Sequence, residues 1–340
     1  MTIDLRDIEH KYDDAVGVTV LAPADLPGTV ADRSASGGRR TRQLGSGSSA
    51  GEAVLSYLDI QAARLAALGP AVRRDEADAV HQMRVAARRL RAALQAFPTV
   101  LPRPATAHLR DELKWLGQVL GTARDLEVLK GAFSSALDAT PAEIVLGPAR
   151  ARLTRHFAPH EAAARQAALD ALDSTRYAAL LDELHALLIA PPQGKAATAP
   201  ATQELPRAVG QAYRRTKRGM KRARRLPPGQ ARDLSLHEAR KAAKRARYAA
   251  EVTRPVAGQP ARRFAARMKA VQSVLGDHHD AITAQAAARE IGVNAHLAGE
   301  NAFTFGVLHE RATHQAATAD EQAAAAWQRA AGRKSRRWLR

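Results

Sequence analysis

The chain has 340 residues, of which 46% are hydrophobic and only 4% aromatic, and it contains no cysteine. Its formal net charge is +18, with a pI of about 11.0. The lack of cysteine excludes disulfides and thiolate metal sites, and the scarcity of β-branched and aromatic residues makes a β-sheet unfavourable. The charge predicts attraction to nucleic acid, anionic lipid or another polyanion.

The first 51 residues are rich in Gly, Ser, Pro and polar residues and show little apolar periodicity, so we expect this segment to be mostly disordered. The N-terminus has no apolar signal-peptide core, and the chain has no run of about 18 apolar residues. We therefore predict no membrane insertion and a cytoplasmic location.

From Glu52 onward the apolar residues recur with helical period, which predicts an all-α fold. Expected stop signals are Gly69-Pro70, Gly121 and the residue before Pro255, and residues 190–203 read as a linker. A basic tail over residues 332–340 is expected to be loose. The predicted helices cover residues 52–69, 76–97, 104–120, 125–137, 141–157, 159–189, 204–225, 233–253, 259–275, 278–290 and 295–331.

Two pairs of similar segments indicate an internal duplication. VHQMRVAARRLRAAL (80–94) matches LHEARKAAKRARYAA (236–250), and LKWLGQVLGTARD (113–125) matches MKAVQSVLGDHHD (268–280). The pairs occur in the same order at a nearly constant offset. We predict two pseudo-symmetric helical bundles, over residues 52–189 and 204–331.

Three of the predicted helices carry a cationic side opposite an apolar side. On a helical wheel the cations of each copy fall within a sector of about 80°. Like charges at i,i+4 cost about 0.2–0.5 kcal/mol a pair, so these acid-poor faces favour a bound polyanion over a merely solvated surface. The cationic sides comprise His81, Arg84, Arg88 and Arg91; His237, Arg240, Lys244 and Arg247; and Arg207, Arg214, Arg218 and Lys221.

The side chains on these cationic faces favour phosphate as the bound group. Arginine predominates, and a guanidinium binds phosphate oxygens through two parallel hydrogen bonds. Nucleic acid remains an alternative, but no helix-turn-helix, zinc-finger, RRM or KH pattern is present, and the basic faces lack the aromatic residues that stack on bases.

The paired motifs resemble the CHAD family (conserved histidine α-helical domain) over about residues 52–331. This resemblance implies two helical bundles around a central basic cavity that binds inorganic polyphosphate, in proteins that associate with polyphosphate granules. It also implies that the histidines and cations of the two copies line this cavity. Four further residues would sit nearby, namely Lys114, Arg124, Lys269 and His279.

Residues 7–13, DIEHKYD, resemble the opening strand of CYTH triphosphatases through Asp7, Glu9 and Lys11. In that family carboxylates bind metal and lysines bind triphosphate inside a β-tunnel. The segment before the Gly/Ser-rich stretch is too short to supply the strands of a tunnel, so we interpret it as a remnant. Residual triphosphatase or polyphosphatase activity is an alternative function.

The run Asp277-His278-His279-Asp280 suggests either a metal site or a helix N-terminus capped by Asp277, and we favour the cap because neighbouring helical residues point about 100° apart. No P-loop or nucleophile elbow is present. We therefore expect no cofactor, no metal and no catalysis. The leading hypothesis is a polyphosphate-binding protein, with nucleic-acid binding or a scaffold for acidic proteins as alternatives.

Overall fold

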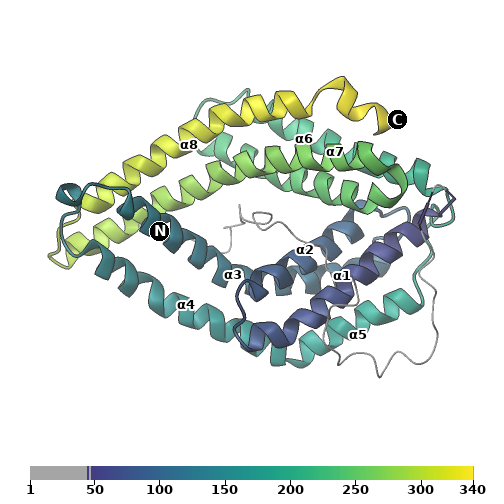
Figure 1. Ribbon diagram of the computed structural model, residues 1–340, viewed down its shortest axis with the longest axis horizontal. Helices are drawn as coiled ribbons and strands as arrows, with labels where there is room; N and C mark the ends of the chain where they lie inside the picture. Colours follow the sequence, from purple (N-terminus) through teal and green to yellow (C-terminus); the bar gives the residue numbers. More distant parts are fainter. Residues whose placement is uncertain (1–43, 46, 340) are drawn as a thin grey trace.

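The computed structural model describes residues 44–45 and 47–339, and this part of the chain is all-α, as predicted (Figure 1). Its eight α-helices are joined by loops and two 3-10 helices, and a third 3-10 helix follows α8. It contains no strand beyond one isolated bridge between Ser49 and Pro200. None of the described helices is apolar over a length that would cross a bilayer. The helices are α1 (Ala50–Arg73), α2 (Ala79–Ala96), α3 (Ala107–Asp138), α4 (Ala149–Asp173), α5 (Thr175–Ile189), α6 (Ala201–Ala223), α7 (Gln230–Leu297) and α8 (Phe303–Ala330).

The helices form two groups that meet at both ends of the molecule (Figure 1). Helices α6, α7 and α8 lie along one side, and α1 to α5 lie along the other. The groups contact each other through α2 with α7 and α1 with α6, among other pairs. This arrangement sets α2 and α3 opposite the first part of α7.

Two hydrophobic cores hold the groups together. The larger one contains residues of all eight α-helices, including Leu58, Leu94 and Met268. The smaller one joins the C-terminal parts of α3 and α7 to α4 and α8 around Phe157 and Phe305. Alanine supplies much of both cores, and its small side chain lets the helices approach closely. Both cores therefore draw on both of the predicted halves.

Two of the predicted helix ends are wrong because burial continues beyond the stop signal. Helix α1 passes through Pro70 to Arg73, with Gly69 and Val72 buried on its core side. Helix α3 passes through Gly121, so the two helices predicted over 104–120 and 125–137 are one. Tertiary packing outweighs the local breaker at both places.

Three further boundaries differ from the prediction. The break predicted before Pro159 lies at Ser174, whose hydroxyl accepts a hydrogen bond from the Tyr177 amide at 3.2 Å and so caps α5. Helix α7 passes through Pro255, and the break predicted between residues 253 and 259 is present at Gly258, which has φ 56° and ψ −132°. It then runs to Leu297, so Asp277 lies inside a helix and is not a cap.

Segments predicted to be loose are partly held in place. In the 190–203 linker, the amides of Gly194 and Ala196 donate to the carbonyls of Val100 and Thr99, each at 2.9 Å. The tail forms the 3-10 helix η4 (Arg333–Leu339), which packs on α6 and α7. Of the segment predicted to be disordered, Ala50 and Gly51 already belong to α1, and the CYTH-like residues 7–13 lie outside the described residues.

Candidate functional site

A cavity of about 530 Å³ lies between α2, α3 and the part of α7 before Gly258. Its two walls come from the two groups of helices, so it lies where the repeated motifs face each other. Seven lysine and arginine side chains line it, against two carboxylates, Asp125 and Glu238. The cations are Arg84, Arg88 and Arg91 of α2, Lys114 of α3, and Lys241, Lys244 and Arg245 of α7.

The excess of positive charge makes the cavity an anion site. Partly enclosed walls of one sign raise the local concentration of oppositely charged ligands and strengthen their binding relative to open water. The lining also offers neutral hydrogen-bonding groups, including His237, Gln95 and Thr122. An elongated anion with many acceptor oxygens would match this set of donors.

Arg84 is held at the α2–α3 contact. Its Nη1 lies 3.3 Å from Oδ1 of Asp125, and both side chains are buried. A Cβ atom at Gly121 would lie 3.4 Å from both Nε and Nη2 of Arg84. The glycine and the aspartate of the LGTARD segment thus make room for the guanidinium and neutralise part of its charge.

Alanine substitutions at two glycines of α3 test this contact. Gly131→Ala should raise the free energy of unfolding by about 0.5–1 kcal/mol, because alanine favours a helix and nothing lies near the added methyl group. Gly121→Ala should fall short of that gain, because the added methyl group would contact the buried Arg84 guanidinium and shield it further from water. Urea unfolding of both variants measures the difference, and equal stabilisation would show that Arg84 does not need the space.

Tyr248 connects the two walls beneath the cavity. Its hydroxyl accepts a hydrogen bond from Nη2 of Arg88 on α2 at 3.1 Å. Its ring lies 4.6 Å from the guanidinium carbon of Arg247 on its own helix. With Tyr248 only 1% exposed, these contacts fix the position of Arg88 at the cavity surface.

A partly buried charge cluster lies behind Tyr248. Glu251 is 3.2 Å from Nε of Arg247 and 3.4 Å from Nε of Arg89, and it accepts a hydrogen bond from the Tyr57 hydroxyl at 3.4 Å. Burial, and then the charge of Glu251, raises the pKa of Tyr57 well above its usual value. Burial alone would lower the pKa of Arg89. The charge of Glu251, together with Tyr57 and Tyr248, raises this pKa by more than burial lowers it, so the net shift is upward. The cluster joins α1, α2 and α7.

The histidines are placed differently from one another. His237 lines the cavity, and its ring lies 4.4 Å from that of His279. His81 is buried beside the cavity, where burial lowers its pKa and the nearby Arg124 and Arg84 lower it further, although Asp78 opposes them. It is therefore neutral at pH 7. Burial also lowers the pKa of His278, although Asp233 lies 3.3 Å away and opposes the shift.

A CHAD domain model matches residues 56–289 of the sequence. The chain belongs to the CHAD family. It is 36% identical over 260 residues to the proteins named Rv2226 and MT2285 from two strains of Mycobacterium tuberculosis, covering 75% of this chain and 48% of each relative. The chain thus spans about half the length of these curated relatives.

Solved structures share the fold. The CHAD domain from the plant Ricinus communis is 27% identical, with a TM-score of 0.62 over 82% of this chain and 90% of that one. PptA from Streptomyces chartreusis is 24% identical, with a TM-score of 0.70 over 83% of this chain and all of that one. The fold of this chain is therefore that of other CHAD domains.

Not all of the predicted residues of this CHAD domain reach the cavity. Arg84, Arg88, Arg91, Lys114, His237 and Lys244 line it. Arg240 and Arg247 are buried in α7, with exposures of 0% and 2%. Arg124 pairs with Glu127, and Lys269 is exposed on α7, so neither is part of the lining.

The cations predicted on α6 lie on another surface. Arg207, Arg214, Arg218 and Lys221 are all exposed, and none of them lines the cavity. Conversely, Lys241, Arg245 and Tyr248 line the cavity but are not among the predicted residues. Lys241 and Arg245 follow His237 at i+4 and i+8, so their helical spacing was a usable signal.

Proposed function

We propose that this CHAD domain binds inorganic polyphosphate in the cavity between α2, α3 and α7 without cleaving it. The observation that carries this proposal is the set of seven cations, drawn from both walls, against two carboxylates. Consecutive phosphates of one chain would contact both walls, and the release of condensed counterions would favour association. Binding of this kind fits a cytoplasmic protein associated with polyphosphate granules.

The composition of the lining supports a ligand recognised through phosphate alone. Tyr248 is the single aromatic residue among those lining the cavity, and its buried hydroxyl is engaged by Arg88. Proteins that bind single-stranded nucleic acid stack bases on exposed aromatic rings. The cavity offers no such ring, which favours polyphosphate over DNA or RNA.

The two carboxylates support binding over hydrolysis. Asp125 lies beside Arg84, and Glu238 lies 3.4 Å from Nζ of Lys241. Each carboxylate is thus engaged in an ion pair with a cation of the protein. The chain therefore holds polyphosphate in place for storage or for other proteins.

A competition assay tests the proposal. Long-chain polyphosphate should displace a labelled polyphosphate from the full chain at a lower concentration of charge than single-stranded DNA does. The logarithm of the binding constant should fall linearly with the logarithm of the salt concentration. If DNA competes better, the chain is a nucleic-acid-binding protein instead.

A phosphate-release assay tests the absence of catalysis. The full chain should release no phosphate from tripolyphosphate in the presence of Mg²⁺ or Mn²⁺. Release that is lost in a Glu9→Gln, Lys11→Gln variant would contradict the proposal and assign triphosphatase activity to the N-terminal segment.

A further inference from the structure

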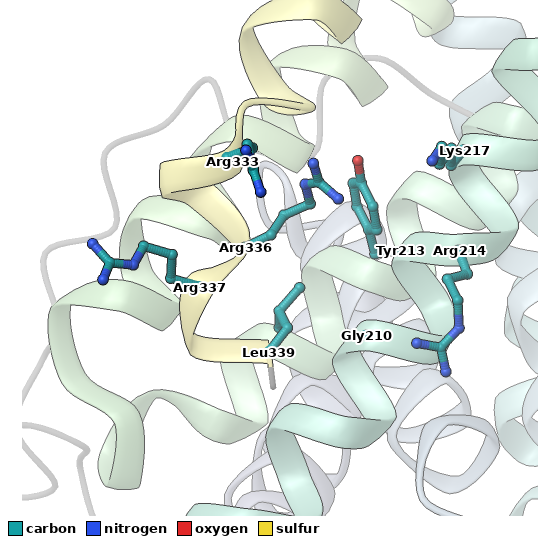
Figure 2. Close-up of a pocket in the computed structure, with 8 residues that line it drawn as sticks. All are labelled: Gly210, Tyr213, Arg214, Lys217, Arg333, Arg336, Arg337 and Leu339. Atoms are coloured by element: carbon teal, nitrogen blue, oxygen red, sulfur yellow. The ribbon is translucent and has the colours of Figure 1, made fainter.

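A second recess, separate from the cavity, lies where η4 packs on α6 (Figure 2). Its volume is about 540 Å³. None of the residues that line it also lines the cavity between α2, α3 and α7. We call it the tail pocket, and its lining comprises Gly210, Tyr213, Arg214 and Lys217 of α6 with Arg333, Arg336, Arg337 and Leu339 of η4.

Apolar contacts hold the tail on α6. The ring of Trp338 lies edge-on to that of Phe264, with centroids 5.7 Å apart, and both Trp338 and Leu339 pack against the larger core. A Cβ at Gly210 would lie 3.5 Å from the carbonyl oxygen of Leu339, so the glycine lets the tail backbone lie close to α6. These contacts involve no charged side chain.

The charges in the tail pocket are of one sign. Five of its eight lining residues are Lys or Arg, and none is acidic. Within residues 44–45 and 47–339, none of these five cations forms an ion pair with a carboxylate within 4.0 Å. Arg124 and Arg152, in contrast, pair with Glu127 and Glu300. Cations gathered in one recess repel one another, and a bound anion would remove that cost.

Arg336 and Tyr213 form the inner part of the tail pocket. The guanidinium of Arg336 lies over the Tyr213 ring at 5.3 Å, and its buried Nε makes no hydrogen bond within the described structure. Buried donors are nearly always paired, so this one points to a missing acceptor. Figure 2 shows the Tyr213 hydroxyl between Arg336 and Lys217.

The Tyr213 hydroxyl is suited to donate to an anion. Its ring stacks on Trp327 at 5.6 Å, and burial raises the pKa of Tyr213 although Arg336 lowers it. The phenol therefore keeps its proton at neutral pH. Together with the guanidinium and amine groups, it forms a set of donors around one recess.

We propose that the tail pocket is a second anion site, which binds a short segment of inorganic oligophosphate. Arginine forks and a phenol hydroxyl are donors for tetrahedral phosphate oxygens, and α6 and η4 supply them from two sides. This site would exist even if the cavity bound a different ligand. It would also give the exposed Arg214, which does not line the cavity, a role in binding the anion.

Charge-removal variants of the full chain test the tail pocket. Lys217→Gln with Arg333→Gln removes one cation from each side, and Arg262→Gln with Arg263→Gln removes two exposed cations of α7 that line neither recess. Calorimetric titration with tripolyphosphate should show two binding events in the wild type and in the control. The first variant should lose one event or weaken it at least about tenfold, because it loses two hydrogen bonds to charged groups.

Tryptic cleavage of the tail separates this result from binding in the cavity. Tripolyphosphate should slow cleavage after Arg337 in the wild type and equally in a cavity variant, Lys114→Gln with Lys241→Gln. It should not slow cleavage in Lys217→Gln with Arg333→Gln. Equal protection in that variant would overturn the proposal that the tail pocket binds oligophosphate. Loss of protection in the cavity variant would also overturn it, and so would stronger protection of the wild type by single-stranded DNA of equal charge.

Discussion

Lys114→Glu combined with Lys241→Glu is expected to lower the affinity for long-chain polyphosphate about 100-fold or more at low salt. The two lysines face the cavity from α3 and α7, so the variant places a negative charge on each wall. Each substitution removes a charge-assisted contact and repels the remaining phosphates. Fluorescence anisotropy with a labelled polyphosphate measures the loss.

The matched control reverses two charges outside the cavity. Arg262→Glu with Arg263→Glu changes the net charge equally and at exposed positions of α7. It should weaken binding only slightly, through the long-range field, and that effect should vanish with added salt. If the control loses as much affinity as the cavity variant, binding follows net charge and the cavity has no special role.

The choice of lysines follows from burial. The repeated motifs alone point to reversal of Arg84 and Arg240. These side chains are only 3% and 0% exposed, and Arg84 lies beside Asp125. A glutamate there would place two carboxylates together in the protein interior and unfold the chain, so loss of binding would carry no information about the cavity.

Glu251→Gln is expected to lower the free energy of unfolding by about 3 kcal/mol. The carboxylate faces Arg247 and Arg89 at the junction of α1, α2 and α7, and the neutral amide keeps its shape but not its charge. Removing one partner of a buried ion pair costs far more than removing an exposed one, because the remaining cations stay desolvated. Urea unfolding followed by circular dichroism measures the change.

Glu238→Gln serves as the comparison. Glu238 is 65% exposed and pairs with Lys241 at 3.4 Å, so its loss should cost less than about 1 kcal/mol. Equal effects of the two substitutions would contradict the view that the cluster around Glu251 stabilises the contact between the two groups of helices. Both variants keep the helix content of the chain, so circular dichroism reports on each in the same way.

Much of the fold can be predicted from the sequence because helical periodicity is strong and β-formers are scarce. The all-α class, the helix over residues 79–96 and the helix that begins near residue 201 follow from apolar spacing alone. The motif segments that form α2 and the first part of α7 are also recognisable, because cations and alanines alternate with helical period. The internal duplication remains a prediction from these motifs.

The helix ends are harder to predict because breakers act locally and packing acts over the whole fold. Pro70 looks like a stop, yet Val72 beyond it is buried against the core. Gly121 looks like a stop, yet it lies inside α3, where it is buried and the Arg84 guanidinium packs against it. The bend of α7 falls at Gly258, whose positive φ favours glycine, and not at the prolines on either side.

The site is only partly predictable, because a helical wheel shows which residues share one face of a helix but not which other helix or solvent that face contacts. The cationic sides of α2 and α7 meet across a cavity, whereas that of α6 is exposed. Arg240, Lys244 and Arg247 share a side of α7 and are all buried, but only Lys244 lines the cavity. The tail pocket depends on η4, which the basic composition of residues 332–340 predicts to be loose.

The most direct test of the central claim is a crystal structure of the full chain with a linear oligophosphate. Consecutive phosphates should lie between the two walls, with their oxygens about 2.7–2.9 Å from nitrogens of Arg88, Lys114 and Lys244. Phosphate bound only on the outer face of α6, with the cavity between α2, α3 and α7 left unfilled, would contradict the claim.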